Sequence, residues 1–83
     1  MAKQNNTLTI DIHGLYVEEA LKELREFINK APKTTEKIIV IHGHNNGTAL
    51  QEAVRRRLRS PRIQEISARF GNDGESVVWL RRM

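Results

Sequence analysis

Two short apolar runs without alternation set the strongest limits on the fold of this chain. Ile38–Ile41 is a β-branched run, and Val77–Leu80 is a second unbroken apolar run. Strands buried on both faces carry such runs, whereas strands with one wet face alternate between apolar and polar residues. Thr7–His13 and Ile63–Phe70 alternate in this way. We therefore expect a four-stranded sheet with the unbroken strands in the middle and the alternating strands at the edges.

A first amphipathic helix is expected between the first two strands. Apolar residues repeat at helical spacing from Val17 to Ile28, with charged residues on the other face. Pro32 ends this helix because it lacks the amide hydrogen that a helix needs. Tyr16 stands at the entry, where no short side-chain oxygen is present to cap the helix.

A second helix is expected after residue 47. Thr48 and Gln51 have the spacing of a capping box, and Ser60-Pro61 stops the helix. Its expected buried residues are Leu50, Ala53, Val54 and Leu58. The order of elements is therefore βαβαββ.

This order of elements defines a fold. A hairpin makes the fourth strand antiparallel to the third, and right-handed crossovers place both helices on one face of the sheet. The prediction is an α+β domain, an α/β two-layer sandwich with the strand order 1-2-4-3 and one open sheet face. We expect this domain to span residues 7–83, after a disordered tail at residues 1–6.

The length and composition narrow the class of protein. The chain has 83 residues and no cysteine, which limits it to one small domain. Without thiols it is neither a disulfide-stapled secreted scaffold nor a zinc protein built on cysteine. No apolar run approaches the roughly 20 residues of a membrane span, and no signal-peptide pattern opens the chain. We therefore expect a cytoplasmic domain without a membrane partner.

The charges are distributed unevenly. Residues 1–41 carry six basic and six acidic groups, whereas residues 42–83 carry eight arginines against four acidic groups. Guanidinium is a planar ligand that binds phosphate through two hydrogen bonds, so the second half favours an anionic partner such as nucleic acid. The alternative is a solvated basic helix face.

All three histidines are expected at one edge of the sheet. The carboxyl ends of the first three strands share this edge, where ligands bind in α/β folds. Asp11 and His13 project from the same face of their strand, so Asp11 could orient the His13 imidazole and fix its tautomer. His42 closes the neighbouring strand and would bring a second imidazole near the first. Two histidines suit phosphodiester cleavage, with one as base and the other as acid. The catalytic candidates are Asp11, His13 and His42.

Two other interpretations of these residues stay open. Asp11 and His13 could simply hydrogen-bond the loop backbone and secure the first turn. A metal site is the other interpretation, formed by Asp11, His13, His42 and His44. A divalent metal suits these residue types but is not supported by their spacing, so we predict no metal site and no cofactor.

The loop after the Ile38–Ile41 strand could bind phosphate. Gly43 and Gly47 let backbone amides turn outward, and the following helix presents its positive end. No lysine follows the second glycine, so the pattern is weaker than a Walker loop, and an ordinary loop capped by Thr48 is the alternative. The candidate phosphate contacts are Gly43, His44, Asn45, Gly47, Thr48, Arg55, Arg56 and Arg69.

Two short motifs resemble those of the small MutS-related (Smr) domain family. Ile10-Asp11-Ile12-His13 is similar to its Leu-Asp-x-His signature, and His42-Gly43-His44-Asn45 is similar to its His/Thr-Gly-x-Gly signature. Asn45 stands where glycine is usual, and Gly47 follows two residues later. The resemblance covers roughly residues 7 to 82 and implies a fold like that of the C-terminal domain of translation initiation factor three.

The resemblance also implies a function. Smr domains bind nucleic acid, several nick DNA or cleave RNA, and some act at stalled ribosomes. We therefore expect a compact stand-alone Smr domain that binds RNA or structured DNA and acts as an endonuclease. The alternatives are a non-catalytic module that binds nucleic acid or a ribosomal surface, and a plain protein-interaction domain.

Overall fold

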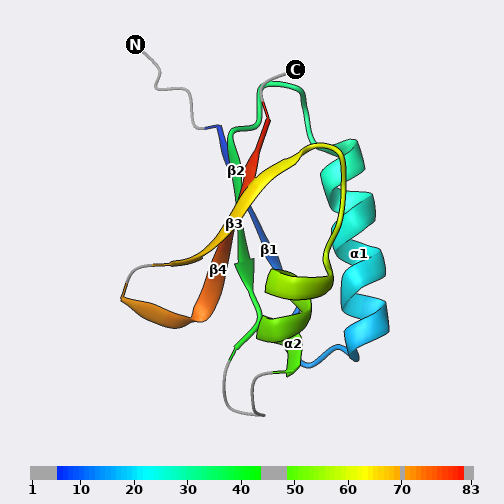
Figure 1. Ribbon diagram of the computed structural model, residues 1–83, viewed down its shortest axis with the longest axis vertical. Helices are drawn as coiled ribbons and strands as arrows, with labels where there is room; N and C mark the ends of the chain where they lie inside the picture. Colours follow the sequence, from blue (N-terminus) through cyan, green and yellow to red (C-terminus); the bar gives the residue numbers. More distant parts are fainter. Residues whose placement is uncertain (1–5, 44–48, 70, 82–83) are drawn as a thin grey trace.

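The fold is a four-stranded sheet covered by helices on one side (Figure 1). The computed structural model describes residues 6–43, 49–69 and 71–81. Its elements are β1 (Thr7–Asp11), α1 (Val17–Lys30), β2 (Lys37–Ile41), α2 (Ala49–Glu52), the π-helical turn η1 (Ala53–Arg57) that continues α2, β3 (Ile63–Arg69) and β4 (Asn72–Leu80). The expected order βαβαββ is confirmed.

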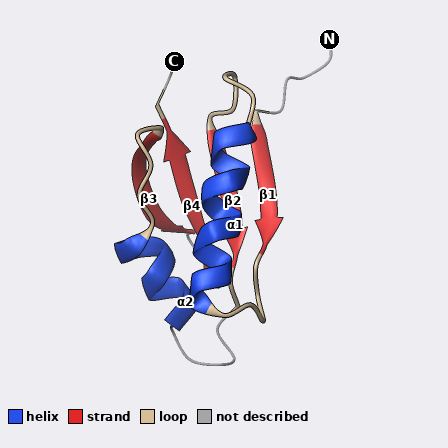
Figure 2. Ribbon diagram, turned by 90° about the vertical axis from the view of Figure 1, so that its right-hand side faces the viewer, coloured by secondary structure: helices blue, strands red, loops and turns tan. Residues whose placement is uncertain are grey.

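The sheet has the strand order β1-β2-β4-β3, which confirms the prediction 1-2-4-3. β1 and β2 are parallel, whereas β4 runs antiparallel to both β2 and β3. Figure 2 shows α1 and α2 in front of the same face of the sheet, so the other face is open. The register aligns Asp11 of β1 with Ile41 of β2 and Glu75 of β4, which places these three residues in one row across the sheet.

The core lies between the sheet and the helices. β2 is buried along both faces, with Ile38 and Val40 on the helix side and Ile39 on the open side, as its unbroken apolar run predicts. Each large apolar side chain removed from water contributes about 1.5–3 kcal/mol. The largest fully buried apolar side chains are Ile12, Leu24, Ile28, Ile38, Val40, Val54, Leu58 and Val78.

Helix α1 follows its predicted pattern closely. It buries Ala20, Leu21, Leu24 and Ile28 against the core. Its last carbonyls are held from outside the helix, because the Arg62 guanidinium donates hydrogen bonds to the carbonyls of Ile28 (2.6 Å) and Ala31 (2.8 Å). The sequence did not indicate this contact across the domain. None of the helices in the described ranges is long and apolar enough to cross a membrane.

The second helix is shorter than predicted. We expected it to run to Ser60-Pro61, but it ends with the π-helical turn at Arg57. Leu58 is extended and its amide donates to the Ala53 carbonyl at 3.0 Å, the five-residue spacing of a π turn. Leu58 is still buried, because this wide turn directs it into the core. The expected cap at Thr48 lies outside the described residues.

The hairpin is also tighter than the sequence predicted. We expected a turn at residues 71–74, but β4 already begins at Asn72, which pairs with Arg69. Gly74 lies within β4, and its carbonyl accepts the amides of both His42 and Gly43, each at 2.9 Å. These bonds continue the β2–β4 ladder past Ile41 and keep this part of β4 extended. The expected tail lies outside the described residues, apart from Asn6, whose carbonyl accepts the Glu36 amide at 2.8 Å.

Candidate functional site

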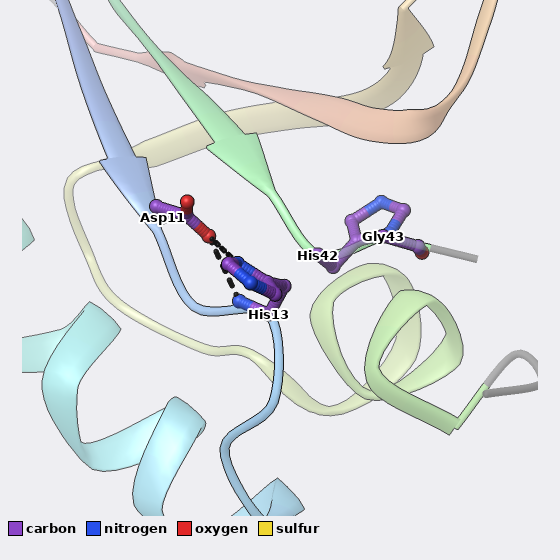
Figure 3. A network of polar contacts seen from close by, with 4 residues as sticks. All are labelled: Asp11, His13, His42 and Gly43. Carbon is purple, nitrogen blue, oxygen red and sulfur yellow. Dashed lines mark hydrogen bonds and ion pairs between the residues drawn. The ribbon is translucent and has the colours of Figure 1, made fainter. Parts of the chain in front are cut away.

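Asp11 and His13 form a hydrogen-bonded pair at the carboxyl end of β1. The residue between them, Ile12, is buried in the core, so both polar side chains project to the opposite, open side of the sheet. The Asp11 Oδ1 atom accepts the His13 backbone amide at 3.0 Å and lies 2.5 Å from His13 Nδ1 (Figure 3). Both side chains are exposed, His13 to 68% and Asp11 to 50%. The predicted orientation of His13 by Asp11 is therefore present.

These bonds fix the chemistry of the pair. A carboxylate accepts hydrogen bonds, so Nδ1 carries the proton and Nε2 is the ring nitrogen left to face a ligand. The hydrogen bonds from the His13 ring and from the His13 amide hold the pKa of the Asp11 carboxyl below its ordinary value. Asp11 is therefore ionised at neutral pH and keeps the imidazole in a single tautomer.

His42 lies in a different environment. It has the same facing as Ile38 and Val40, toward the helices, and is only 3% exposed. Its Nδ1 lies 2.9 Å from the Gly43 carbonyl, and its Nε2 lies 2.9 Å from the Ser76 hydroxyl. In Figure 3 its ring points away from the Asp11–His13 pair. The expected meeting of two imidazoles at one edge therefore does not occur.

The hydrogen bonds around His42 have a single order of donors and acceptors. The Arg55 Nε–H group can only donate, so at 3.1 Å the Ser76 Oγ atom accepts from it and donates its own proton to His42 Nε2. His42 then keeps its proton on Nδ1 and donates it to the Gly43 carbonyl. Ser76 is fully buried, and this network satisfies each of its polar atoms. Sequence reasoning missed Ser76, because a lone serine in an apolar strand carries no motif.

Gly43 connects the two histidines. It has a φ of +75°, which favours glycine, and its amide donates to the Gly74 carbonyl. A Cβ placed on Gly43 would lie 3.5 Å from the His13 Cβ, so the two residues are neighbours. The conformation of this glycine therefore sets the surface on which His13 rests. The other loop candidates, His44, Asn45, Gly47 and Thr48, lie outside the described residues.

The candidate arginines flank the site from both sides of the sheet. Arg55 reaches Ser76 from the helix side. On the open side, Arg69 forms an ion pair of 2.6 Å with Glu75, which shares the row of Asp11 two strands away, roughly 10 Å. Arg56 is exposed.

The other described arginines of the second half are spread over the molecule. Arg57 pairs with Glu18 of α1 at 2.6 Å, Arg62 holds the end of α1, and Arg81 follows β4 at the far end of the strands. The seven arginines that the structure describes in this half are therefore not one continuous surface with the histidine edge. Only Arg55 and Arg69 among the described candidates contact residues that adjoin it.

Within the described residues, no group of three or more histidine, aspartate or glutamate side chains is arranged to hold a metal ion. Of the four side chains considered for a metal, His42 has both ring nitrogens in hydrogen bonds, and His44 lies outside the described residues.

Comparisons with known proteins point to one family. The profile of the Smr domain matches residues 10–81. Endonuclease MutS2 of Anaeromyxobacter sp. (strain Fw109-5) is 37% identical over 78 residues, which covers 88% of this chain and 10% of that protein. The crystal structure of the Smr domain of Thermus thermophilus MutS2 matches with a TM-score of 0.77 and 32% identity, covering 89% of this chain and 98% of that one.

Proposed function

Because the chain belongs to the Smr domain family, we propose that it binds nucleic acid and cleaves phosphodiester bonds in RNA or structured DNA. The observation that carries the proposal is the exposed Asp11–His13 pair, an oriented imidazole whose Nε2 has no hydrogen bond to a described residue. A relative that matches this chain is named an endonuclease, but this chain spans only 10% of its length, so that activity supports the proposal without establishing it.

His13 has the central role in this mechanism. Its Nε2 takes the proton of the attacking hydroxyl as the new oxygen–phosphorus bond forms, or binds a phosphate oxygen once the ring is protonated. Asp11 holds the ring in place and stabilises the imidazolium. The leaving oxygen takes its proton from water, because both ring nitrogens of buried His42 are engaged. His42 supports the site by fixing the Gly43 carbonyl.

The remaining candidates hold the sugar-phosphate backbone in this proposal. The loop contributes Gly43, His44, Asn45, Gly47 and Thr48, and the guanidinium groups of Arg55, Arg56 and Arg69 bind phosphates beyond the reacting one. Arg55 is suited to this task, since only its Nε–H is engaged within the described part of the chain. A cytoplasmic location and an association with ribosomes remain predictions from the sequence.

A gel cleavage assay tests the catalytic proposal. Parent protein, Asp11→Ala, His13→Ala and Arg25→Ala are purified identically and incubated with structured RNA and with branched DNA. Arg25 is an exposed residue on α1 and serves as the control for purification and for charge. We expect cleavage by the parent and by Arg25→Ala and its loss in the other two variants. Equal cleavage by all four proteins would assign the activity to a contaminant or to other residues.

A non-catalytic binding module is the second candidate. The observation that favours it is the burial of His42, so that His13 is the one imidazole exposed at the edge among the residues that the structure describes. Such a module holds nucleic acid or a ribosomal surface at the same edge. Its affinity would fall steeply with salt, by a slope of about −0.9 per phosphate contact on duplex DNA, while no cleavage appears. An affinity that does not change with salt would contradict both nucleic-acid functions.

A further inference from the structure

Tyr16 is unusually exposed for an aromatic residue. Its exposed fraction is 82%, against 37% for Trp79, the other large exposed apolar side chain in the described ranges. The Trp79 ring already makes contacts within the protein, since its N–H donates to Ser67 at 3.3 Å and the Lys37 ammonium lies 5.0 Å from the ring centroid. The Tyr16 ring instead faces solvent.

Tyr16 occupies a position where another residue would stabilise the helix. It is the N-cap of α1, and no side-chain oxygen of Tyr16 caps the helix. Glu19 accepts the Tyr16 amide at 3.4 Å, which is one half of a capping box. Serine or threonine at position 16 would supply the other half. The chain therefore forgoes a stabilising cap and presents an aromatic ring instead.

Tyr16 lies close to the candidate site along the chain. Leu15 donates its amide to the Ile12 carbonyl at 3.2 Å and closes a tight turn that carries His13. Tyr16 lies three positions after His13, which limits the distance between their Cα atoms to about 11 Å. Gly14 lies between them with a φ of +84°, and a Cβ placed on it would meet no atom within 4 Å. Gly14 therefore adds no side chain between the two residues and borders open space.

The negative charges around this surface are partly compensated. Glu18 in the first turn of α1 is paired with Arg57 at 2.6 Å, whereas Glu19, which accepts the Tyr16 amide, and Asp11 keep their negative charge. The positive end of α1 points to the same place. A phosphate at His13 and a base at Tyr16 are therefore compatible.

We propose that Tyr16 is a stacking platform for an unpaired nucleobase that adjoins the phosphate held at His13. The inference rests on the proposed function and narrows its substrate to nucleic acid with an unpaired nucleotide at the site, because the faces of a base inside a duplex are already covered. Stacking of a base on an aromatic side chain is sequence-tolerant and strong enough to matter at a small site.

Four proteins separate stacking from helix stability. Tyr16→Phe keeps the ring, Tyr16→Ser completes the capping box without a ring, and Tyr16→Leu is apolar without either. Binding of a short single-stranded oligonucleotide is measured for these and the parent at several salt concentrations, and repeated with an oligonucleotide that carries abasic sites. Melting temperatures are recorded in parallel.

We expect Tyr16→Phe to bind like the parent, and Tyr16→Ser and Tyr16→Leu to bind roughly 5- to 150-fold more weakly with an unchanged salt slope. Tyr16→Ser should melt about 4–8 °C higher than the parent. The abasic oligonucleotide should remove the difference between the variants. Equal binding by the parent and Tyr16→Ser would overturn the stacking inference and leave the proposed function intact. Absence of binding by the parent would overturn both.

Discussion

His13 and His42 lie in two sequence motifs that follow the neighbouring strands β1 and β2, yet the environments of their side chains are opposite. The His13 side chain is 68% exposed and bonds to one carboxylate, whereas His42 is 3% exposed and has both ring nitrogens engaged. The cause is their position relative to the strands. His13 follows β1 by two residues and keeps the facing of Asp11, whereas His42 follows Ile41 by one residue and turns to the helices.

This difference separates the histidine that we propose to be catalytic from a structural one. Both ring systems are fixed in one tautomer by hydrogen bonds, so orientation alone does not separate them. The distinction is the second ring nitrogen: the Nε2 of His13 has no hydrogen bond to the part of the chain that the structure describes, while the Nε2 of His42 accepts the Ser76 proton. We therefore expect substitutions at the first pair to change function and substitutions around the second to change stability.

The largest expected effect is on catalysis at His13. His13→Gln removes the proposed general base, so cleavage should fall about 10²- to 10⁴-fold. The free energy of unfolding should change by no more than about 0.5 kcal/mol, because the side chain is exposed. Cleavage rates and urea denaturation measure the two effects. A large loss of stability would mean that His13, like His42, is structural.

The next effect is on stability around His42. Ser76→Ala leaves the Arg55 Nε–H without its acceptor and His42 Nε2 without its donor, in a fully buried position. An unsatisfied buried polar group costs about 1–3 kcal/mol, which urea denaturation would measure.

Ser67→Ala is the matched control for this substitution. Ser67 lies on β3, the strand next to β4, and on the open face it accepts the Trp79 N–H at 3.3 Å. Its loss should cost about 0.5–1 kcal/mol, less than the loss of Ser76. Equal costs for the two serines would show that the buried network adds nothing to an ordinary surface hydrogen bond.

The contrast between the histidines also marks what the sequence could reveal. Alternation in β1 and its absence in β2 were sufficient to predict the strand order and the pairing of Asp11 with His13. The same absence of alternation hid the facing of His42, because an unbroken apolar run carries no phase. The parallel register aligns Asp11 with Ile41, so these two residues face the same side of the sheet. Once this register is known, the facing of β1 gives the facing of β2 and of His42. Arg62 and Ser76 act across long stretches of chain, so no local pattern indicates them.

A smaller effect is expected at Gly43, which lies between the two histidines. Gly43→Ala places a side chain at a φ of +75°, which costs roughly 1–2 kcal/mol. Gly71→Ala is the control, since Gly71 has a φ of +78° with no atom near an added Cβ. Both variants should lose similar stability by urea denaturation, but only Gly43→Ala should shift the NMR signals of the His13 ring. Unchanged His13 signals would show that Gly43 does not set the surface under that ring.

The smallest effect concerns the titration of Asp11. The His13 ring and amide lower the pKa of its carboxyl below the ordinary 3.8, so the bond to His13 contributes stability above that pH. This contribution is lost as the pH falls through the lowered pKa of the folded state. His13→Ala removes the ring but keeps the amide, so the pKa should rise and still remain below 3.8. Carboxyl-carbon NMR across the acid range measures both values. An Asp11 pKa at or above 3.8 in the parent would mean that the Asp11–His13 hydrogen bonds are not formed in solution. His13 would then differ from His42 in its exposure alone.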